Sequence, residues 1–257
     1  MKDKTNIKNH RIGETNKNIF GQKIIIIEYI NARDITAQFE DGFKVQTTYQ
    51  LFNKGYVKNP NYRSVYNVGY FGIGKYKAKI NSKDTPEYKT WLAMMGRCYN
   101  LHTHSKNPTY IDCTVCEEWH NFQNFAKWYE DNYYEIEGEL MCLDKDILIK
   151  GNRIYSPDNC VFVPKNINLL FTKSNIVRGD YPIGVDFVKT SNKYRARCLD
   201  GFGKSIYLGL YLNPFDAFIA YKKHKEKTIK SIAKLYEDKI PKKLYFALYN
   251  YIVEITD

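Results

Sequence analysis

The stretch from Leu140 to Phe171 constrains the fold of this chain most, because it combines two short apolar runs, a turn signal and a helix start. The first run, Leu140 to Leu143, has the length and composition of a strand. Gly151-Asn152 allows the chain to reverse before the second run, Cys160 to Val163. Pro164 then suits the first position of a helix. The stretch therefore predicts a strand, a reversal, a second strand and a helix, which together form a ββα unit.

The polar residues of this unit fall where a divalent cation could be bound. Asp144 follows the first strand directly, and Asn166 and Asn168 lie on the expected helix. Oxygen ligands on two rigid elements suit Mg²⁺ or Mn²⁺ and leave coordination positions open for a phosphate group. We therefore expect a metal site at this strand end. The plain alternative is that Asp144 and Asp146 are only polar residues where a strand stops.

The segment around this unit carries further motifs in order. Between about Tyr88 and Lys173 they are RCYN, CEEW, FQNFAKWY, LDKDI, GN, YSPDNC and FVP. In this order they resemble the HNH-type endonuclease domains that are common in bacteriophage genomes. The resemblance implies that Asp144 is a metal ligand, that Asn159 braces the loop and that Asn168 is the second ligand.

Lys145 stands where the resemblance implies a general-base histidine. Lysine stays charged near neutral pH unless it is desolvated or lies beside other cations, so it would stabilise phosphate charge rather than activate water. Asp146 is a substitute base. Two functions stay open: a DNA endonuclease that nicks or cuts at a specific site, and an inactive DNA-binding or inhibitory phage protein with a protein partner. An RNA-binding accessory factor is a third.

Cys113 and Cys116 have the spacing of one half of a zinc site. The side chains that could complete four ligands are Cys98, Cys142, Cys160, His102 and His104. A second pair with this spacing is absent from the sequence, and cysteine often packs as a small buried apolar residue. The sequence therefore favours thiols without metal over structural Zn²⁺, and it favours unpaired thiols over disulfides.

Three strand signals follow residue 182: GVDFV, KYRARCL and KSIYLGLYL. In the second strand, basic residues alternate with packing residues, which predicts one basic face made by Lys193, Arg195 and Arg197. A long helix begins at Asn213-Pro214, with Phe215, Phe218 and Ile219 expected to face inward. Its lysines are expected on the outer surface: Lys222, Lys223, Lys225, Lys227 and Lys230.

This last segment resembles the ethylene-response-factor (apetala-type) DNA-binding domain. The matching residues are Gly184-Val185, Tyr194 to Arg197, Tyr207-Leu208-Gly209 and the helix from Ala217 to Tyr221. In that family the exposed sheet face enters the major groove, which implies double-stranded DNA as the partner. The implied contacts are Lys193, Arg195, Arg197, Lys204 and Tyr207. The sequence departs from the family at Asp186, where a basic residue is usual, and at Tyr207, where tryptophan is usual.

The N-terminal segment predicts a small antiparallel β domain from the runs GQKIIIIEYI, ARDITAQFE and GFKVQTTYQ. Glu40-Asp41-Gly42 supplies a hairpin turn between the second and third runs. The polar residues before them form either a solvated tail or an arm that reaches a phosphate backbone through Lys2, Lys4, Lys8 and Arg11. In the middle segment, Thr85 and Pro86 predict a helix start.

These expectations combine into an α+β multidomain chain. It comprises an N-terminal β-rich domain (residues 1–80), an HNH-like domain (residues 81–172) and an apetala-like DNA-binding domain with C-terminal helices (residues 173–257). A formal net charge of +11 favours polyanionic partners. No apolar run approaches the roughly 20 residues of a membrane span, and the N-terminus has no apolar signal region. We therefore expect no membrane association and a location in the cytoplasm, in this case that of a phage host.

Overall fold

The structure is a computed structural model that describes residues 10–172 and 181–257. In these residues the chain is a mixed α+β protein with several small antiparallel sheets and seven α-helices. The expected arm residues Lys2, Lys4 and Lys8 lie outside the described residues, as do the first residues of the expected C-terminal domain (residues 173–180). Within the described ranges, no helix has the length and apolarity to cross a bilayer. Contacts divide the chain into two compact units, residues 1–100 with 117–126 and residues 101–116 with 127–257.

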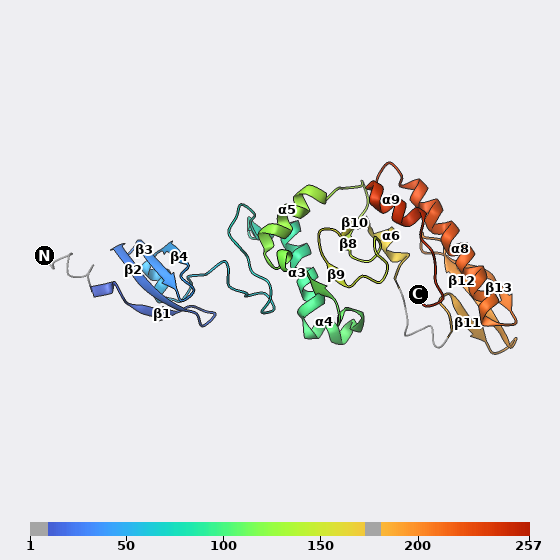
Figure 1. The fold of residues 1–257 in the computed structure, drawn as a ribbon, viewed down its shortest axis with the longest axis horizontal. Helices are drawn as coiled ribbons and strands as arrows, with labels where there is room; N and C mark the ends of the chain where they lie inside the picture. Colours follow the sequence, from blue (N-terminus) through green and yellow to red (C-terminus); the bar gives the residue numbers. More distant parts are fainter. Residues whose placement is uncertain (1–9, 173–180) are drawn as a thin grey trace. The chain divides into compact units, whose positions relative to one another are not determined.

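The first unit contains a four-stranded antiparallel sheet in the order β1-β2-β3-β4 (Figure 1). Its strands are β1 (Thr15–Lys17), β2 (Lys23–Asn31), β3 (Asp34–Phe39) and β4 (Lys44–Thr47). Alternate residues of β2 and β3 are buried, and they pack with Phe52 of helix α2 (Tyr49–Asn53) into one apolar core. Gly42 has a φ of +87° in the β3–β4 turn, where the sequence predicts a hairpin. The small antiparallel sheet expected here is therefore present.

Helical structure completes the first unit. Helix α3 (Pro86–Tyr99) begins as predicted, with Thr85 accepting a hydrogen bond from the Tyr88 amide and Pro86 in the first turn. The indole Nε1 of Trp91 donates to the carbonyl of Trp119 at 2.7 Å, and this hydrogen bond links α3 to the segment that precedes α5. The remaining elements are β5 (Lys79–Ile80), β6 (Lys83–Asp84), the 3₁₀ helix η2 (Glu117–His120) and α5 (Phe122–Asn132), of which α5 continues into the second unit.

The second unit contains the predicted ββα arrangement. Strand β8 (Met141–Asp144) pairs antiparallel with β10 (Val161–Pro164), and α6 (Lys165–Leu169) follows at once. Between the two strands, β9 (Ile154–Tyr155) pairs in parallel with β7 (Thr114–Val115). The short helices α4 (Leu101–Lys106) and η1 (Pro108–Tyr110) precede β7.

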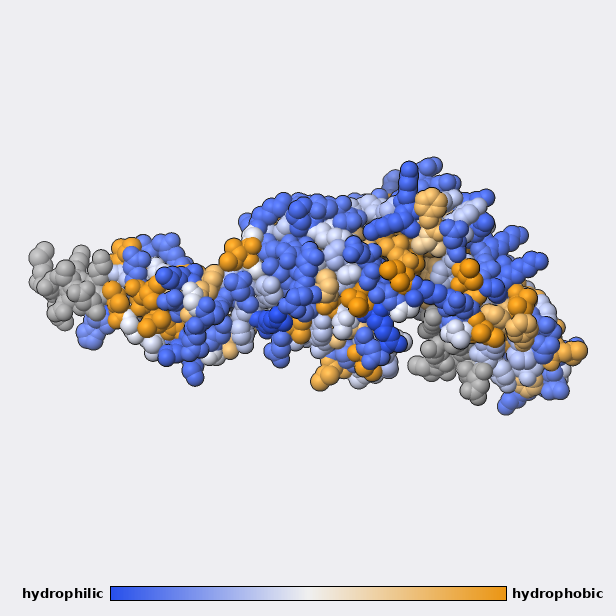
Figure 2. Space-filling model, in the orientation of Figure 1, coloured by the Kyte–Doolittle hydropathy of each residue, from blue (hydrophilic) through white to orange (hydrophobic). Residues whose placement is uncertain are grey.

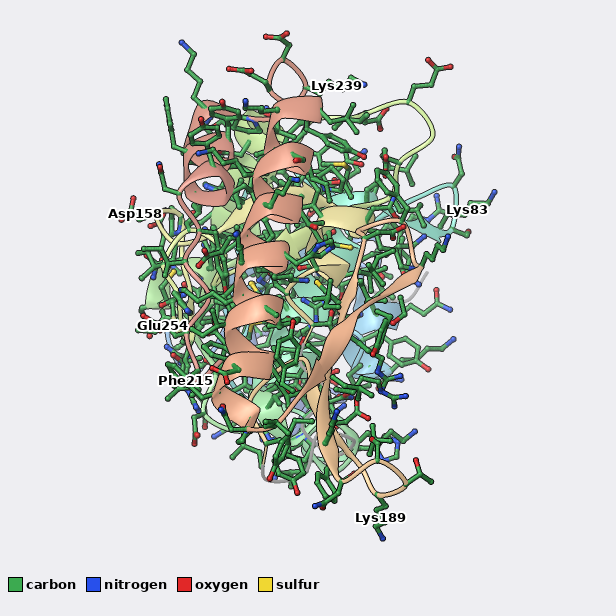
Figure 3. The ribbon with its side chains drawn as sticks, turned by 90° about the vertical axis from the view of Figure 1, so that its right-hand side faces the viewer. Lys83, Asp158, Lys189, Phe215, Lys239 and Glu254 are labelled. Carbon is green, nitrogen blue, oxygen red and sulfur yellow. The ribbon has the colours of Figure 1, made fainter. Side chains whose placement is uncertain are left out.

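The C-terminal part of the second unit is a three-stranded antiparallel sheet with a long helix on it. The elements are β11 (Val185–Val188), β12 (Lys193–Leu199), β13 (Ser205–Tyr211), α8 (Pro214–Leu235) and α9 (Lys242–Tyr249). Asn213 caps α8 by accepting a hydrogen bond from the Asp216 amide at 2.8 Å. Figure 3 shows α8 along its length, with the strands on one side and Glu254 on the other.

Helix α8 belongs to two apolar cores. Its first half packs against the three-stranded sheet through Ala217, Phe218 and Tyr221. Its second half packs with α9 against the ββα unit, and Ile229 and Ile232 belong to the same buried cluster as Val163. One rigid helix therefore holds the ββα unit and the sheet within the same compact unit.

The phase of α8 corrects three sequence expectations. Phe215 and Ile219 were expected to face inward but are 57% and 44% exposed. Lys225 was expected on the outer surface but is only 7% exposed. The buried stripe instead runs through Phe218, Tyr221, Lys225 and Ile229, which also have helical spacing. Lys225 therefore replaces an apolar residue in the stripe.

Candidate functional site

Asp144 lies at the last position of β8, opposite Val161 of β10. Its Oδ1 accepts hydrogen bonds from the backbone amides of Asp146 at 2.9 Å and Ile147 at 2.8 Å, so the carboxylate organises the turn after the strand. Among the described residues, no group donates to its Oδ2. One carboxylate oxygen is thus fixed by the turn, and the other has no donor within residues 10–172 and 181–257.

The surroundings of Asp144 disfavour its ionised form. Burial, and after it the negative charge of Asp146, together raise the pKa of Asp144 to about 6. The amides of Ile147 and Asp146 and the charge of Lys145 oppose this rise in pKa without cancelling it. A bound cation would stabilise the ionised carboxylate, because it would compensate both the lost hydration and the neighbouring carboxylate.

Lys145, at the position implied for a general base, is a buried residue with 9% exposure. Its Nζ lies 3.2 Å from Asp146 Oδ2 and 5.9 Å from the centre of the Tyr155 ring. The ammonium therefore has an acceptor and an aromatic face beside it. In this arrangement Lys145 holds the Asp146 carboxylate, whose side chain remains 45% exposed.

A chain of hydrogen bonds braces the loop after Asp144. Asn159 donates through Nδ2 to Asn152 Oδ1 at 3.1 Å, and Asn152 Nδ2 donates to the Lys145 carbonyl at 2.6 Å. The same Nδ2 also donates to the Ile154 carbonyl at 2.8 Å. The sequence resemblance implies a bracing role for Asn159, whereas Asn152 is expected only in a turn. The missed signal is that asparagine can accept from one segment and donate to another at the same time.

Asn168 lies on α6, the helix that directly follows β10 and contacts β8. Its side chain is half-buried, and its backbone carbonyl accepts from the Phe171 amide at 3.1 Å. Asn166, one position before Ile167 on the same helix, is exposed and donates to Glu139 at 3.2 Å. The structure therefore places Asn168 and Asp144 on adjacent elements of one ββα unit, and it uses Asn166 for a surface contact.

Cys113 and Cys116 flank the parallel β7–β9 pair. Cys113 is buried, its thiol donates to the Thr109 carbonyl at 3.8 Å, and burial raises its pKa. Burial likewise raises the pKa of Cys160 to about 12. In the part of the chain that the structure describes, no three His, Cys, Asp or Glu side chains gather as a metal-binding group. Burial in apolar surroundings keeps such thiols protonated, which weakens them as zinc ligands.

The second candidate surface is the face of the three-stranded sheet that points away from α8. Ala196 and Cys198 of β12 are buried against the helix, as the alternating pattern predicts. Alternation places the basic residues of β12 on the opposite face, namely Lys193, Arg195 and Arg197. The outer face of β12 is therefore basic from Lys193 to Arg197, and Leu199 ends it.

Strand β13 adds aromatic surface to this face. Tyr207 is paired with Arg197 across the strands and is 61% exposed. A bulge follows, because Ala196 pairs with Gly209 while Arg197 pairs with Tyr207. Gly209 has a φ of +128°, which glycine adopts most readily. Lys204 is exposed in the β12–β13 turn, where its amide donates to Asp200 at 3.1 Å.

Asp186 of β11 neutralises part of the basic face. Arg195 Nη2 lies 2.6 Å from Asp186 Oδ2, and Arg197 Nε lies 3.1 Å from Oδ1. Partial burial acts to raise the pKa of Asp186, but the Arg195 hydrogen bond and the charges of both arginines lower it overall. Asp186, which departs from the apetala-type pattern, thus forms ion pairs with both arginines that were expected to contact DNA.

The second unit therefore contains two candidate surfaces: a strand-end carboxylate in a braced loop, and a basic sheet face with an exposed tyrosine. Both are held against α8 by the cores described above. The first suits a divalent cation, and the second suits a polyanion. Comparisons with known protein families, with curated proteins and with solved structures find no match to this chain.

Proposed function

We propose that this chain is a metal-dependent endonuclease of the HNH type that hydrolyses phosphodiester bonds in double-stranded DNA. The observation that carries the proposal is the position of Asp144 and the hydrogen bonding of its carboxylate. It ends a strand of a ββα unit, and two backbone amides fix one of its oxygens while the other has no described donor. Its raised pKa supports a position that an ion would stabilise.

The oxygen donors that the ββα unit offers are of the kind that Mg²⁺ or Mn²⁺ prefers. Asp144 offers a carboxylate oxygen, Asp146 a second carboxylate nearby, and Asn168 an amide oxygen on the adjacent helix. Magnesium sites in nucleic-acid enzymes commonly use one or two carboxylates and complete their coordination with water and phosphate oxygens. When bound, the cation would polarise the scissile phosphate and stabilise the leaving oxygen.

The protein's own residues would supply the remaining chemistry. We assign the general base to Asp146, because its exposed carboxylate can be reached by water and Lys145 holds it in place. Lys145 would also stabilise negative charge on the phosphate. Asn152 and Asn159 keep the loop in one conformation, so that these groups need little reorganisation during the reaction.

The outer face of the β11–β13 sheet would bind the DNA that is cut. Its arginines can contact phosphates or guanine edges, and Tyr207 offers an exposed ring next to them. The resemblance to apetala-type domains supports the same face. An enzyme that binds DNA with the sheet and cuts it at the ββα unit must work where DNA is accessible, such as the cytoplasm of a phage-infected bacterium.

A second candidate function is a DNA-binding or inhibitory protein that keeps the ββα scaffold without cutting. The observation that favours it is Lys145, which is buried beside Asp146 where a base would be needed. The Lys145 ammonium lies 3.2 Å from Asp146 Oδ2, so it occupies an oxygen of the carboxylate that would have to act as base. Under this alternative the basic face, or a protein partner bound to the scaffold, would carry the function.

Incubation of the full chain with supercoiled plasmid in Mg²⁺ or Mn²⁺ separates the two candidates. Conversion to the nicked or linear form, lost in EDTA, supports the endonuclease. DNA binding without any cleavage between pH 6 and pH 9 in either metal supports the inactive scaffold.

A further inference from the structure

A second basic surface lies on α8 and takes no part in the sites described above. It is a groove of about 550 Å³ between α8 and the chain segment that follows α9. Four lysines line it: Lys222, Lys223, Lys227 and Lys230. Glu226 is the one carboxylate among the described lining residues. In the space-filling view, hydrophilic residues cover much of the α8 and α9 end that faces the viewer (Figure 2).

Lys223, Lys227 and Lys230 share one face of the helix because they are spaced four and three residues apart, and Lys222 lies at the edge of this face. The sheet packs against a different face, which carries Ala217, Phe218 and Tyr221. In Figure 3 the strands and Glu254 flank α8 on opposite sides. The groove is therefore separate from the outer face of the sheet.

Most of the positive charge in the groove is not neutralised. Lys222 pairs with Glu226 at 2.8 Å and donates to the Val253 carbonyl. Lys223, Lys227 and Lys230 are exposed, and none pairs with a carboxylate among the described residues. Lys230 lies with its Nζ 4.0 Å from the centre of the Tyr249 ring, which orders its side chain without removing its charge.

The groove is also connected to the loop of the candidate active site. Lys150, in that loop, donates to the Ile252 carbonyl at 3.0 Å and pairs with Glu254 at 3.0 Å. Ile252 is part of the segment that forms one wall of the groove. The C-terminal segment therefore contacts both the lysine face of α8 and the loop that contains Asp146.

We propose that this groove binds the phosphate backbone of DNA independently of sequence, as a second contact besides the sheet. The inference rests on the proposed function in taking DNA as the substrate. From Lys223 to Lys230 the helix rises by about 10 Å, which matches roughly three phosphates of one strand at 3.4 Å of axial rise each. Lysine ammonium groups suit phosphates as point charges and carry little base specificity.

The test compares two triple variants of the full chain with equal charge changes. The groove variant is K223Q/K227Q/K230Q. The control variant is K106Q/K239Q/K242Q, whose lysines are exposed and lie outside the groove. Binding to a labelled 30-base-pair duplex is measured by fluorescence anisotropy from 50 to 300 mM salt. We expect the groove variant to lose at least tenfold in affinity at 100 mM salt. Its salt slope should fall by about 2 to 3, and the control should change less than twofold.

Equal behaviour of the two variants, in affinity and in slope, would overturn the proposal. A plasmid-nicking assay on wild type keeps this failure distinct from failure of the proposed function. If wild type nicks and the groove variant binds normally, the endonuclease stands and the groove is wrong. If wild type never nicks but the groove variant alone loses binding, the groove stands. Loss of binding only to phosphatidylserine vesicles would reassign the groove to membranes and overturn the proposal.

Discussion

Asn159 donates its side-chain amide to the side-chain oxygen of Asn152 at 3.1 Å, and this contact links the turn before β10 to the loop that follows Asp144. Asn152 also donates to the carbonyls of Lys145 and Ile154. Removing Asn152 therefore leaves several partners unsatisfied, whereas removing Asn159 leaves one. We expect Asn152→Ala to lower the free energy of unfolding by about 2 kcal/mol and Asn159→Ala by about 1 kcal/mol, measured by urea denaturation. Equal losses would contradict the role of Asn152 as the centre of the brace.

Asp144 is expected to destabilise the metal-free fold at neutral pH. Its pKa is about 6 in the folded chain against 3.8 ordinarily, so the folded state binds more protons between these values. Stability then falls as pH rises through this window, and the full penalty applies above it. Asparagine keeps an oxygen for the two amide donors without the charge. We expect Asp144→Asn to stabilise the protein by about 1–3 kcal/mol at pH 7.5 in EDTA.

The pH dependence supplies the control for this prediction. The carboxyl is protonated in both states only well below pH 3.8, so the gain from Asp144→Asn should shrink as pH falls from 6 to 3.8 and vanish well below that. A variant that is less stable than wild type at pH 7.5, or a gain that does not change with pH, would contradict the burial of an uncompensated charge at this strand end.

Local sequence signals were enough to predict the ββα unit. The strands expected at 140–143 and 160–163 are observed one residue later, and the helix begins next to Pro164. The role of Asn152 could not be predicted, because it depends on residues that meet only after the loop has closed. The pairing of β7 with β9 was also missed, since two-residue strands leave no periodicity to detect.

The phase of α8 illustrates the same limit. Two overlapping stripes on this helix have apolar residues at helical spacing, one through Phe215 and Ile219 and one through Tyr221 and Ile229. Only the partners in the folded chain select between them, and they select the stripe that contains Lys225. Lysine usually indicates the exposed face of a helix, but its long apolar side-chain stem allows Lys225 to be buried.

Lys225 leads to a prediction of its own. Burial lowers the pKa of Lys225 below its ordinary value of 10.5, so the unfolded chain holds this proton more tightly than the folded one. Stability due to this group therefore rises with pH up to about 10.5. We expect Lys225→Met to stabilise the protein at pH 7 by about 1 kcal/mol, or roughly 2–4 °C in Tm. The gain should shrink as pH approaches 10.5.

The matched control for this helix is Lys234→Met, which changes an exposed lysine of α8. Thermal unfolding of this variant should follow wild type closely. If Lys225→Met proved destabilising at pH 7, its ammonium would have to contribute a favourable interaction rather than a desolvation cost.

Asp186 is expected to restrain DNA binding by the sheet. Its carboxylate pairs with Arg195 and Arg197, so it competes with phosphates for both guanidinium groups. We expect Asp186→Asn to raise affinity for duplex DNA by about threefold to tenfold and to steepen the salt slope by about one. Asp238→Asn makes the same charge change at an exposed site after α8 and should have a smaller effect. Equal effects of both variants would show that only net charge matters.

The central claim, that Asp144 serves metal-dependent cleavage, is tested most directly by single-turnover nicking of supercoiled plasmid in Mg²⁺. The variants to compare are Asp144→Ala and Asp158→Ala, because Asp158 is an exposed carboxylate of the same loop region (Figure 3). We predict that wild type and Asp158→Ala nick at similar rates and that Asp144→Ala is slower by at least 100-fold while still binding DNA. Nicking by Asp144→Ala at the wild-type rate, or no nicking by wild type in Mg²⁺ or Mn²⁺, would contradict the claim.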